Sequence, residues 1–289
     1  MSFRNIFIFT CSLFLFAGCT LKEPTPQEFI AEKTASKEML LYPQKLDFLT
    51  QNIIPKHVAQ EDFTYRYYAP WIRTHLQHTK KDASWANTSF GIKGRYYGEN
   101  LQAISDEEVS TLTASTNFEA YGSINAHAIM IQNEQMRALP TQKPFFKKTT
   151  LPGEGYPFDY LQISRIHIAE PLLVSHYSKD GAWAYVESSF AAGWVPSHSF
   201  VWLDAKERIP FLNAKKVAIT QDNLPLYNAK QHFVTYAKVG AIFPIEGEDD
   251  DFFHAFIYGK DASGLAHKIT LFIPKTFAKF APLDFTQEN

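Results

Sequence analysis

The chain begins with an almost unbroken apolar run, from Ile6 to Phe16, whose only interruptions are weakly polar residues. Arg4 stands just before this run. A run of this length is too short to cross the hydrocarbon core of a bilayer, which takes about 20 apolar residues. A positive residue followed by a short apolar run is typical of a signal peptide. We therefore predict that residues 1–18 direct export.

The next segments change from polar to weakly helical in character. Residues 19–40 are polar, carry Pro24 and Pro26, and predict a tether. Residues 41–135 predict a mixed, largely helical domain, because helical spacing returns between Leu40 and Gln60. Later in this domain, Ser105–Glu108 has the S-x-x-E spacing of a capping box. It predicts a helix over residues 106–114, and a second helix could follow up to residue 120.

From Ala128 onward the pattern changes to short apolar or alternating runs separated by turn residues, which is typical of small β-barrels. Pro210 predicts a boundary, so we expect one barrel in residues 136–207 and another in 208–289. The expected fold class is α+β, with the helical domain followed by two small β-barrels. The predicted strands lie at 128–131, 166–174, 182–186, 193–202, 215–220, 233–239, 241–245, 252–258 and 267–273.

Composition narrows the chemistry that the protein can perform. The formal net charge is -2, which gives no reason to expect nucleic-acid binding. Aromatic residues make up 15%, which suits small barrels that need bulky core side chains. The only cysteines are Cys11 and Cys19. If residues 1–18 are removed and Cys19 is modified, the mature chain has no thiol for catalysis, metal binding or a disulfide.

The segment Leu15–Cys19 resembles the lipobox of bacterial lipoproteins, although Phe16 stands where Leu is usual. This resemblance implies cleavage before Cys19 and lipidation of its sulfur and new amine. Such a protein would be anchored on the periplasmic face of a bacterial membrane, within the cell envelope. The alternative is an ordinary secretory signal that happens to contain a cysteine.

The later segments resemble a group of multidomain NlpC/p60 cell-wall peptidases. That group has a helical N-terminal domain, two bacterial SH3 domains and a papain-like peptidase domain. The similarity is most specific between Leu139 and Val195 and weaker elsewhere. The motifs that carry it are Tyr67–Trp71, Arg137–Thr141, Gly153–Gln162, Asp180–Val186, Gly193–Val195 and Val217–Ile245.

One feature departs from the resembled family. Its peptidase domain uses a Cys nucleophile with His partners, but no cysteine follows Cys19 in this sequence. The resemblance therefore implies the non-catalytic part of a γ-D-glutamyl-diamino-acid endopeptidase, and whether the chain is itself an enzyme stays uncertain. The expected partners are peptidoglycan peptides and the membrane through the lipid anchor, with a separate peptidase domain as a further candidate.

The resemblance also suggests a substrate-binding face, because the first SH3 domain of those peptidases helps to read the free amine of a stem peptide. The candidate residues are Tyr177, Asp180, Trp183 and Ser188. A carboxylate and hydroxyl groups can bind an ammonium through charge-assisted hydrogen bonds. Asp180 has an alternative role, because Asp-Gly is also common in hairpin turns. Trp194 has the alternative role of a barrel core residue, which we favour for it.

Other chemistry finds little support in the sequence. The ten histidines show no H-E-x-x-H pattern, and we expect neither a metal nor a cofactor. The acidic run Glu246–Asp251 lacks the ligand spacing of an EF-hand and is predicted to be a solvated loop.

Three hypotheses for function follow. The first is a lipid-anchored module that binds peptidoglycan stem peptides. The second is the front part of a split cysteine peptidase. The third is a structural lipoprotein that binds a protein partner through an exposed aromatic stretch, Phe63–Trp71.

Overall fold

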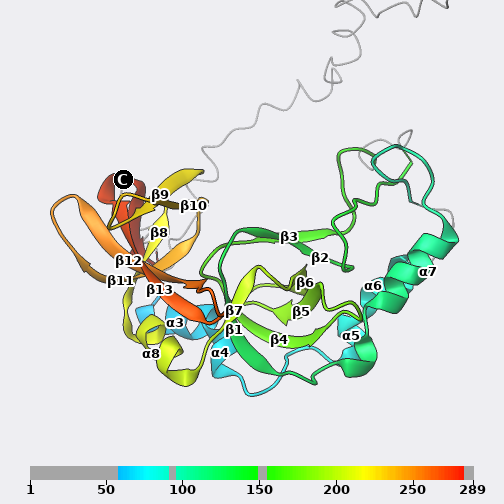
Figure 1. Cartoon of the computed structure of the whole chain (residues 1–289), viewed down its shortest axis with the longest axis horizontal. Helices are drawn as coiled ribbons and strands as arrows, with labels where there is room; N and C mark the ends of the chain where they lie inside the picture. Colours follow the sequence, from blue (N-terminus) through cyan, green and yellow to red (C-terminus); the bar gives the residue numbers. More distant parts are fainter. Residues whose placement is uncertain (1–57, 91–95, 149–154, 283–289) are drawn as a thin grey trace, which may run out of the picture. The chain divides into compact units, whose positions relative to one another are not determined.

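In the computed structural model, residues 58–90, 96–148 and 155–282 are described (Figure 1). All of them belong to one unit of the chain, residues 55–289. The predicted signal peptide, Cys19, the tether and nearly all of the Leu40–Gln60 segment lie outside the described residues.

Short helices fill the described part of the N-terminal domain, which confirms its predicted helical character. We call residues 58–121 the helical region. Its elements are α3 (Gln60–Tyr67), α4 (Ala69–Ile72), α5 (Lys80–Ala83), α6 (Trp85–Phe90), α7 (Asp106–Ser115) and the 3₁₀ helix η2 (Phe118–Ala120).

The capping pattern in the sequence predicted α7 correctly. The Ser105 hydroxyl accepts a hydrogen bond from the Glu108 backbone N–H at 3.1 Å, which satisfies one of the free donors at the helix start. The second helix that could follow is reduced to η2. Asn117 precedes η2 with a left-handed φ of 52°, so the α-helix cannot continue through this residue.

The first seven strands form one antiparallel sheet with the order β3-β2-β6-β5-β4-β1-β7. The strands are β1 (Ala126–Met130), β2 (Glu134–Arg137), β3 (Gln162–Ile166), β4 (Pro171–Tyr177), β5 (Trp183–Glu187), β6 (Ala192–Pro196) and β7 (Phe200–Trp202). The predicted strand at 166–174 is therefore divided between β3 and β4, which flank a turn.

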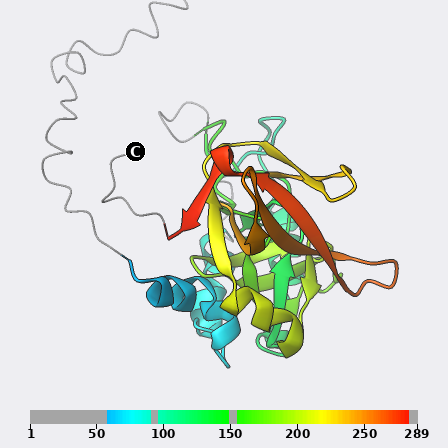
Figure 2. The same cartoon turned by 90° about the vertical axis from the view of Figure 1, so that its left-hand side faces the viewer.

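The second seven strands repeat this topology, with the order β10-β9-β13-β12-β11-β8-β14. Figure 2 shows these strands in yellow to red. They are β8 (Lys215–Ile219), β9 (Leu224–Asn228), β10 (Phe233–Ala237), β11 (Ile242–Glu248), β12 (Phe252–Lys260), β13 (Ala266–Pro274) and β14 (Ala278–Ala281), with the 3₁₀ helix η3 (Lys275–Phe277) before β14.

We call residues 126–202 the first repeat and residues 215–281 the second repeat, because strand n of the first corresponds to strand n+7 of the second. This correspondence bears on where the first barrel begins. Strand β1 lies between β4 and β7, inside the first sheet. We therefore propose that the first barrel begins at Ala126, ahead of the expected residue 136.

The two repeats are connected by α8 (Ala205–Asn213), a helix that the sequence reasoning missed. Asp204 and Glu207 form a reciprocal capping box at its start. Pro210, expected to mark a boundary, lies inside this helix. The buried Phe211 of α8 contacts both Trp71 of α4 and Phe256 of β12, at ring-centroid distances of 5.4 and 4.8 Å. The helix thus joins the helical region to the second repeat.

A buried carboxyl group lies where the first repeat meets α3. Glu170 is 3% exposed, and its carboxyl accepts a hydrogen bond from the Ser189 hydroxyl at 2.8 Å. Burial, only partly offset by this hydrogen bond, raises the pKa of Glu170 from 4.5 to about 7. Near neutral pH the folded protein therefore holds a proton that the unfolded chain has released.

This buried group predicts a pH dependence of stability. Because the folded-state pKa of Glu170 is the higher one, the free energy of unfolding should fall as pH rises from about 4.5 to about 7. The decrease should be on the order of 2 kcal/mol. Urea unfolding of Glu170→Gln across this range should lack that decrease. An unchanged pH profile in the variant would contradict the assignment to Glu170.

Candidate functional site

Each residue of the Gly193-Trp194-Val195 motif meets a different structural requirement. A Cβ atom on Gly193 would lie 2.8 Å from the Arg137 carbonyl oxygen, so only glycine allows β6 to approach β2 this closely. Val195 is buried in the barrel core. Trp194 is fully buried on the opposite face of the sheet, which makes it a core residue, as favoured from the sequence.

Arg137 is fully buried and holds two loops of the first repeat together. Its Nε donates to the Thr141 carbonyl oxygen and its Nη2 to that of Lys143, both at 2.9 Å. Its Nη1 forms an ion pair with Asp159. The Asp159 carboxylate also accepts the backbone N–H groups of Phe145 and Leu161, at 3.0 and 2.9 Å. These motif residues thus have a structural function, because the buried charge has a full set of partners.

A row of side chains crosses the outward face of the first repeat. The register pairs Arg137 of β2 with Trp194 of β6, Trp194 with Tyr185 of β5, and Tyr185 with His176 of β4. Directly paired residues of antiparallel strands lie on the same face. We call these four residues the first row. Phe118 covers it, with its ring centroid 5.9 Å from that of Trp194 and 5.4 Å from that of Tyr185.

A buried carboxylate fixes the loop that precedes α5 against the same face. Glu187 accepts the backbone N–H groups of Gln77 at 2.7 Å and His78 at 3.0 Å, and it contacts the His78 Nδ1 at 2.9 Å. The Tyr121 hydroxyl donates to the His78 carbonyl oxygen at 2.7 Å. Partial burial and the nearby Glu187 charge raise the pKa of Tyr121 to about 12. The helical region is therefore attached to the first repeat both by aromatic contacts of Phe118 and by hydrogen bonds to the Glu187 carboxylate.

Asp180 lies at the exposed tip of the β4–β5 hairpin, where it also has the turn function considered as an alternative. Its Oδ1 accepts hydrogen bonds from the Ser178 hydroxyl at 2.5 Å and the Ala182 N–H at 3.0 Å. These hydrogen bonds hold the pKa of Asp180 below its usual value. Gly181 follows with a φ of 71°, which suits glycine in a tight turn. The carboxylate therefore stays ionised and open to solvent.

The other three candidates do not converge on Asp180. Tyr177 pairs with Ala184 and so lies on the inner face of the sheet, whereas Trp183, the neighbour of Ala184, points to the outer face. Ser188 follows the other end of β5. It is 5% exposed, and its hydroxyl donates to the Ala191 carbonyl oxygen at 2.9 Å. Tyr177, Asp180 and Trp183 thus belong to the β4–β5 hairpin, but Tyr177 and Trp183 lie on opposite faces of the sheet, and Ser188 lies at the other end of β5.

Sequence reasoning missed Trp202 as a neighbour of this hairpin. The Trp202 ring meets that of Tyr177 edge to face at 6.5 Å and is 39% exposed. Trp202 ends the predicted strand 193–202, but nothing in the sequence indicates its partner. Strand β1 lies between β4 and β7, and this strand order brings the two strands close together.

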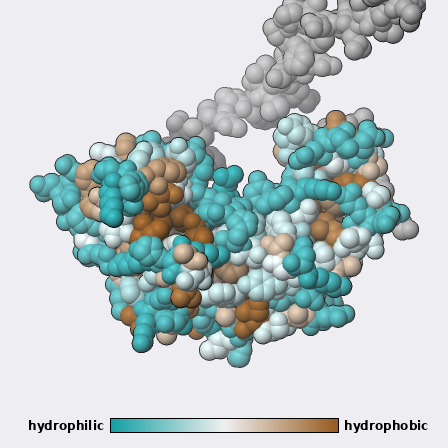
Figure 3. All heavy atoms as spheres, in the orientation of Figure 1, coloured by the Kyte–Doolittle hydropathy of each residue, from teal (hydrophilic) through white to brown (hydrophobic). Residues whose placement is uncertain are grey.

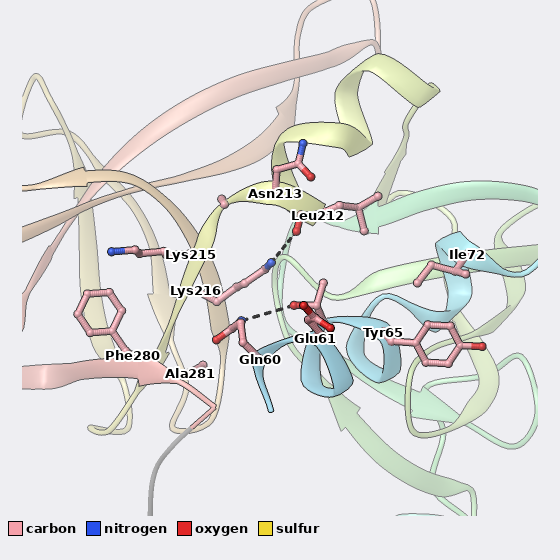
Figure 4. A pocket seen from close by; sticks show the side chains of 12 residues that line it. Gln60, Glu61, Tyr65, Ile72, Leu212, Asn213, Lys215, Lys216, Phe280 and Ala281 are labelled. Atoms are coloured by element: carbon pink, nitrogen blue, oxygen red, sulfur yellow. Dashed lines mark hydrogen bonds between the residues drawn. The ribbon is translucent and has the colours of Figure 1, made fainter. Parts of the chain in front are cut away.

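A large cavity lies apart from these residues, between the helical region and the second repeat (Figure 4). It has a volume of about 840 Å³ and is lined in part by Tyr65, Ile72 and Phe280. Lys216 reaches it, and its Nζ donates to the Leu212 carbonyl oxygen at 2.9 Å. Burial lowers the pKa of Lys216 to about 8. None of the predicted site residues lines this cavity.

The aromatic stretch Phe63–Trp71 is not exposed as a whole, contrary to the third hypothesis. Tyr68 and Trp71 are 1% and 4% exposed, and the Trp71 indole N–H donates to the Ala128 carbonyl oxygen at 2.9 Å. Tyr65 is the exposed member, at 64%. These rings are buried because they join α4 to the first repeat.

Residues 58–90, 96–148 and 155–282 hold neither a membrane-spanning helix nor a metal-binding cluster. Within those ranges, no helix is long and apolar enough to cross a membrane. Among the same residues, no cluster of three or more His, Cys, Asp or Glu side chains is arranged to hold a metal ion. The acidic run Glu246–Asp251 spans the end of β11 and the turn into β12, and Glu248 pairs with Lys275 at 2.6 Å.

The fold and the motif geometry define a helical region followed by tandem SH3-like barrels. Three family models match the sequence: the NLPC_P60 stabilising domain, N-terminal, at residues 8–121; the SH3 domain of SH3b1 type at 144–196; and the SH3 domain of SH3b2 type at 213–250. The chain therefore carries the non-catalytic NlpC/P60-associated domains, including SH3b domains of the cell-wall-binding type. This confirms the resemblance and the fold class.

A solved structure supports the same fold. It is described as a novel NlpC/P60 endopeptidase from Photobacterium damselae subsp. piscicida, and it matches with a TM-score of 0.65 at 22% sequence identity. The match covers 78% of this chain and 52% of that one, so the chain spans about half the length of the solved protein. No curated protein matches the sequence.

The Glu187 contacts predict that removing the charge of this side chain strongly destabilises the folded protein. In Glu187→Gln, the amide can offer only one oxygen to the two backbone N–H groups of Gln77 and His78. We expect the free energy of unfolding to fall by about 2–4 kcal/mol in urea titrations.

Glu246→Gln is the control for Glu187→Gln. Glu246 forms an ion pair with Lys268 on the second repeat, and both side chains are partly exposed. This variant should lose less than about 1 kcal/mol. Equal losses in the two variants would show that Glu187 does not anchor the loop.

Proposed function

We propose that this protein is a lipid-anchored cell-envelope module that binds peptidoglycan stem peptides through its first SH3 domain. The observation that carries the proposal is the exposed Asp180 carboxylate, kept ionised by the Ser178 hydroxyl and the Ala182 N–H. An ionised carboxylate can bind the free amine of a stem peptide by charge-assisted hydrogen bonds. The solvated hairpin gives a peptide end direct access to this carboxylate.

Nearby aromatic side chains support the same assignment. Tyr177 precedes the hairpin, and Trp202 lies edge to face with it. Together they offer apolar ring surface at the base of the hairpin that carries the carboxylate, a combination suited to a short peptide with a cationic end. Trp183 lies on the other face of the sheet from Tyr177, and Ser188 lies at the other end of β5, so we narrow the proposed site to Tyr177, Asp180 and Trp202.

In this proposal, catalysis belongs to a peptidase domain and not to the SH3-like repeats. The solved NlpC/P60 endopeptidase is about twice as long as the matched region. The module would hold a stem peptide for a peptidase domain that supplies the cysteine nucleophile. The hypothesis of a protein-binding stretch at Phe63–Trp71 gains no support, because Tyr68 and Trp71 are buried.

Binding of stem peptides tests the role of Asp180. The purified full chain should bind a stem peptide with a free N-terminal amine and bind the amine-blocked peptide more weakly. Asp180→Asn keeps an oxygen for the turn but removes the charge, and it should weaken binding of the free-amine peptide about fivefold. Calorimetric titration measures both affinities.

Asp261→Asn provides a matched control. Asp261 occupies the β12–β13 hairpin, and its Oδ1 likewise accepts backbone N–H groups, from Ser263 at 2.8 Å and Leu265 at 3.0 Å. This variant should bind as the wild type does. Equal affinity of Asp180→Asn and the wild type, or equal affinity for free and blocked peptides, would refute the proposed role.

Anchoring through Cys19 is tested in bacterial cells. Cys19→Ser should abolish incorporation of labelled fatty acid and release the protein from the membrane fraction. Cys11→Ser removes the other cysteine of the sequence and should leave both properties intact. Fatty-acid labelling that persists in Cys19→Ser would refute the lipid anchor.

A further inference from the structure

The second repeat carries an exposed row of rings on its outward face. The register pairs Phe233 of β10 with Tyr227 of β9, Tyr227 with Phe272 of β13, and Phe272 with His254 of β12. We call these four residues the aromatic row. The side chains lie outward because Leu226, Leu271 and Ala255, which alternate with them along the strands, are buried in the core.

The aromatic row crosses the strands that correspond to those of the buried first row. Strands β9, β13 and β12 of the second repeat match β2, β6 and β5 of the first, which carry Arg137, Trp194 and Tyr185. Phe118 and the loops around it bury the first row. In the second repeat, Phe233 and Tyr227 are 50% and 39% exposed, so no described segment covers them in this way.

Two further rings extend this surface. Tyr236 of β10 is 52% exposed, with its ring 4.9 Å from that of Phe233. Phe252 of β12 is 36% exposed, with its ring 6.3 Å from that of Phe272. Figure 3 shows apolar residues gathered on the visible face of the part of the molecule that holds the second repeat.

The backbone beneath these rings is held in place. The Asn228 side-chain oxygen accepts the N–H groups of Lys230 and His232, at 2.9 and 3.0 Å, and so fixes the β9–β10 turn. The Asn133 amide of the first repeat donates to the Tyr236 carbonyl oxygen at 2.7 Å. A ligand would therefore meet a surface that is already ordered, which lowers the entropic cost of binding.

The size and chemistry of this surface favour a sugar chain over a folded protein. The exposed rings offer roughly 400 Å², which is half of the ~800 Å² that each partner contributes to a standard protein interface. Adjacent rings in the row belong to strands ~4.8 Å apart, so the row forms a narrow track. At one end, the His254 Nε2 contacts the Asp249 carboxylate at 2.8 Å and adds polar groups for sugar hydroxyls.

We propose that the aromatic row stacks against the glycan strand of peptidoglycan. This inference rests on the proposed envelope function but concerns a different ligand and a different domain. The first repeat would bind the amine end of a stem peptide, while the second repeat holds the sugar backbone from which such peptides extend. The apolar faces of sugar rings lie on the aromatic side chains, and their hydroxyl and amide groups remain directed to water or to the Asp249–His254 pair.

Binding of the full chain to peptide-free glycan strands tests this proposal. The strands are prepared by amidase digestion of peptidoglycan, and affinity is measured by calorimetric titration. Phe233→Ala/Tyr236→Ala removes two rings that are at least half exposed, so folding should be preserved and is checked by the unfolding midpoint. We expect about a tenfold loss of affinity for the strands. Phe233→Trp keeps a ring at this position and should retain binding.

Trp85→Ala is the control, because it removes a 45% exposed aromatic side chain from α6 in the helical region. It should bind glycan strands as the wild type does. The double variant should still bind the free-amine stem peptide, and Asp180→Asn should still bind glycan strands. Absence of wild-type binding to the strands would overturn the inference, even if the stem-peptide results hold. Self-association of the wild type in sedimentation, lost in the double variant, would also overturn it in favour of a contact between copies.

Discussion

Each SH3-like sheet of this protein can bury only one of its faces inside its own barrel. A barrel of this size has a small core, so apolar residues on the outward face need cover from elsewhere. In the first repeat, that cover comes from the helical region, where Phe118 packs against Trp194, Tyr185 and His176. Glu187 reinforces this attachment of the N-terminal helices through the loop before α5.

The two repeats share a strand order but differ in what meets their outward faces. The helical region covers the outward face of the first repeat, whereas the corresponding face of the second repeat exposes aromatic rings to solvent. The same topology therefore serves two purposes within one chain. The first repeat integrates the helical region and presents the β4–β5 hairpin, whereas the second repeat is contacted by α8, where Phe211 meets Phe256.

Buried charges in the first repeat keep its loops in place. Arg137 fixes two loops through carbonyl oxygens and Asp159, and Glu187 fixes a third through backbone N–H groups. Such buried charges favour this one arrangement of the loops, because a buried charge that lost its partner would destabilise the fold. Glu170 is the exception, because burial raises its pKa and so favours the neutral, protonated carboxyl group. It therefore makes the α3 junction sensitive to pH.

The sequence by itself determined the α+β class, the order of the domains, α7 and most strands of both barrels, because these follow from local periodicity and capping. It also determined the Gly193–Val195 signature and the Asp180 turn. Only the tertiary structure decided which rings meet: it buried Tyr68 and Trp71, placed Trp202 beside Tyr177, and set Trp183 on the opposite face of the sheet from Tyr177. These outcomes depend on strand order and on which face each neighbour covers, and such long-range pairings leave no periodic trace in the sequence.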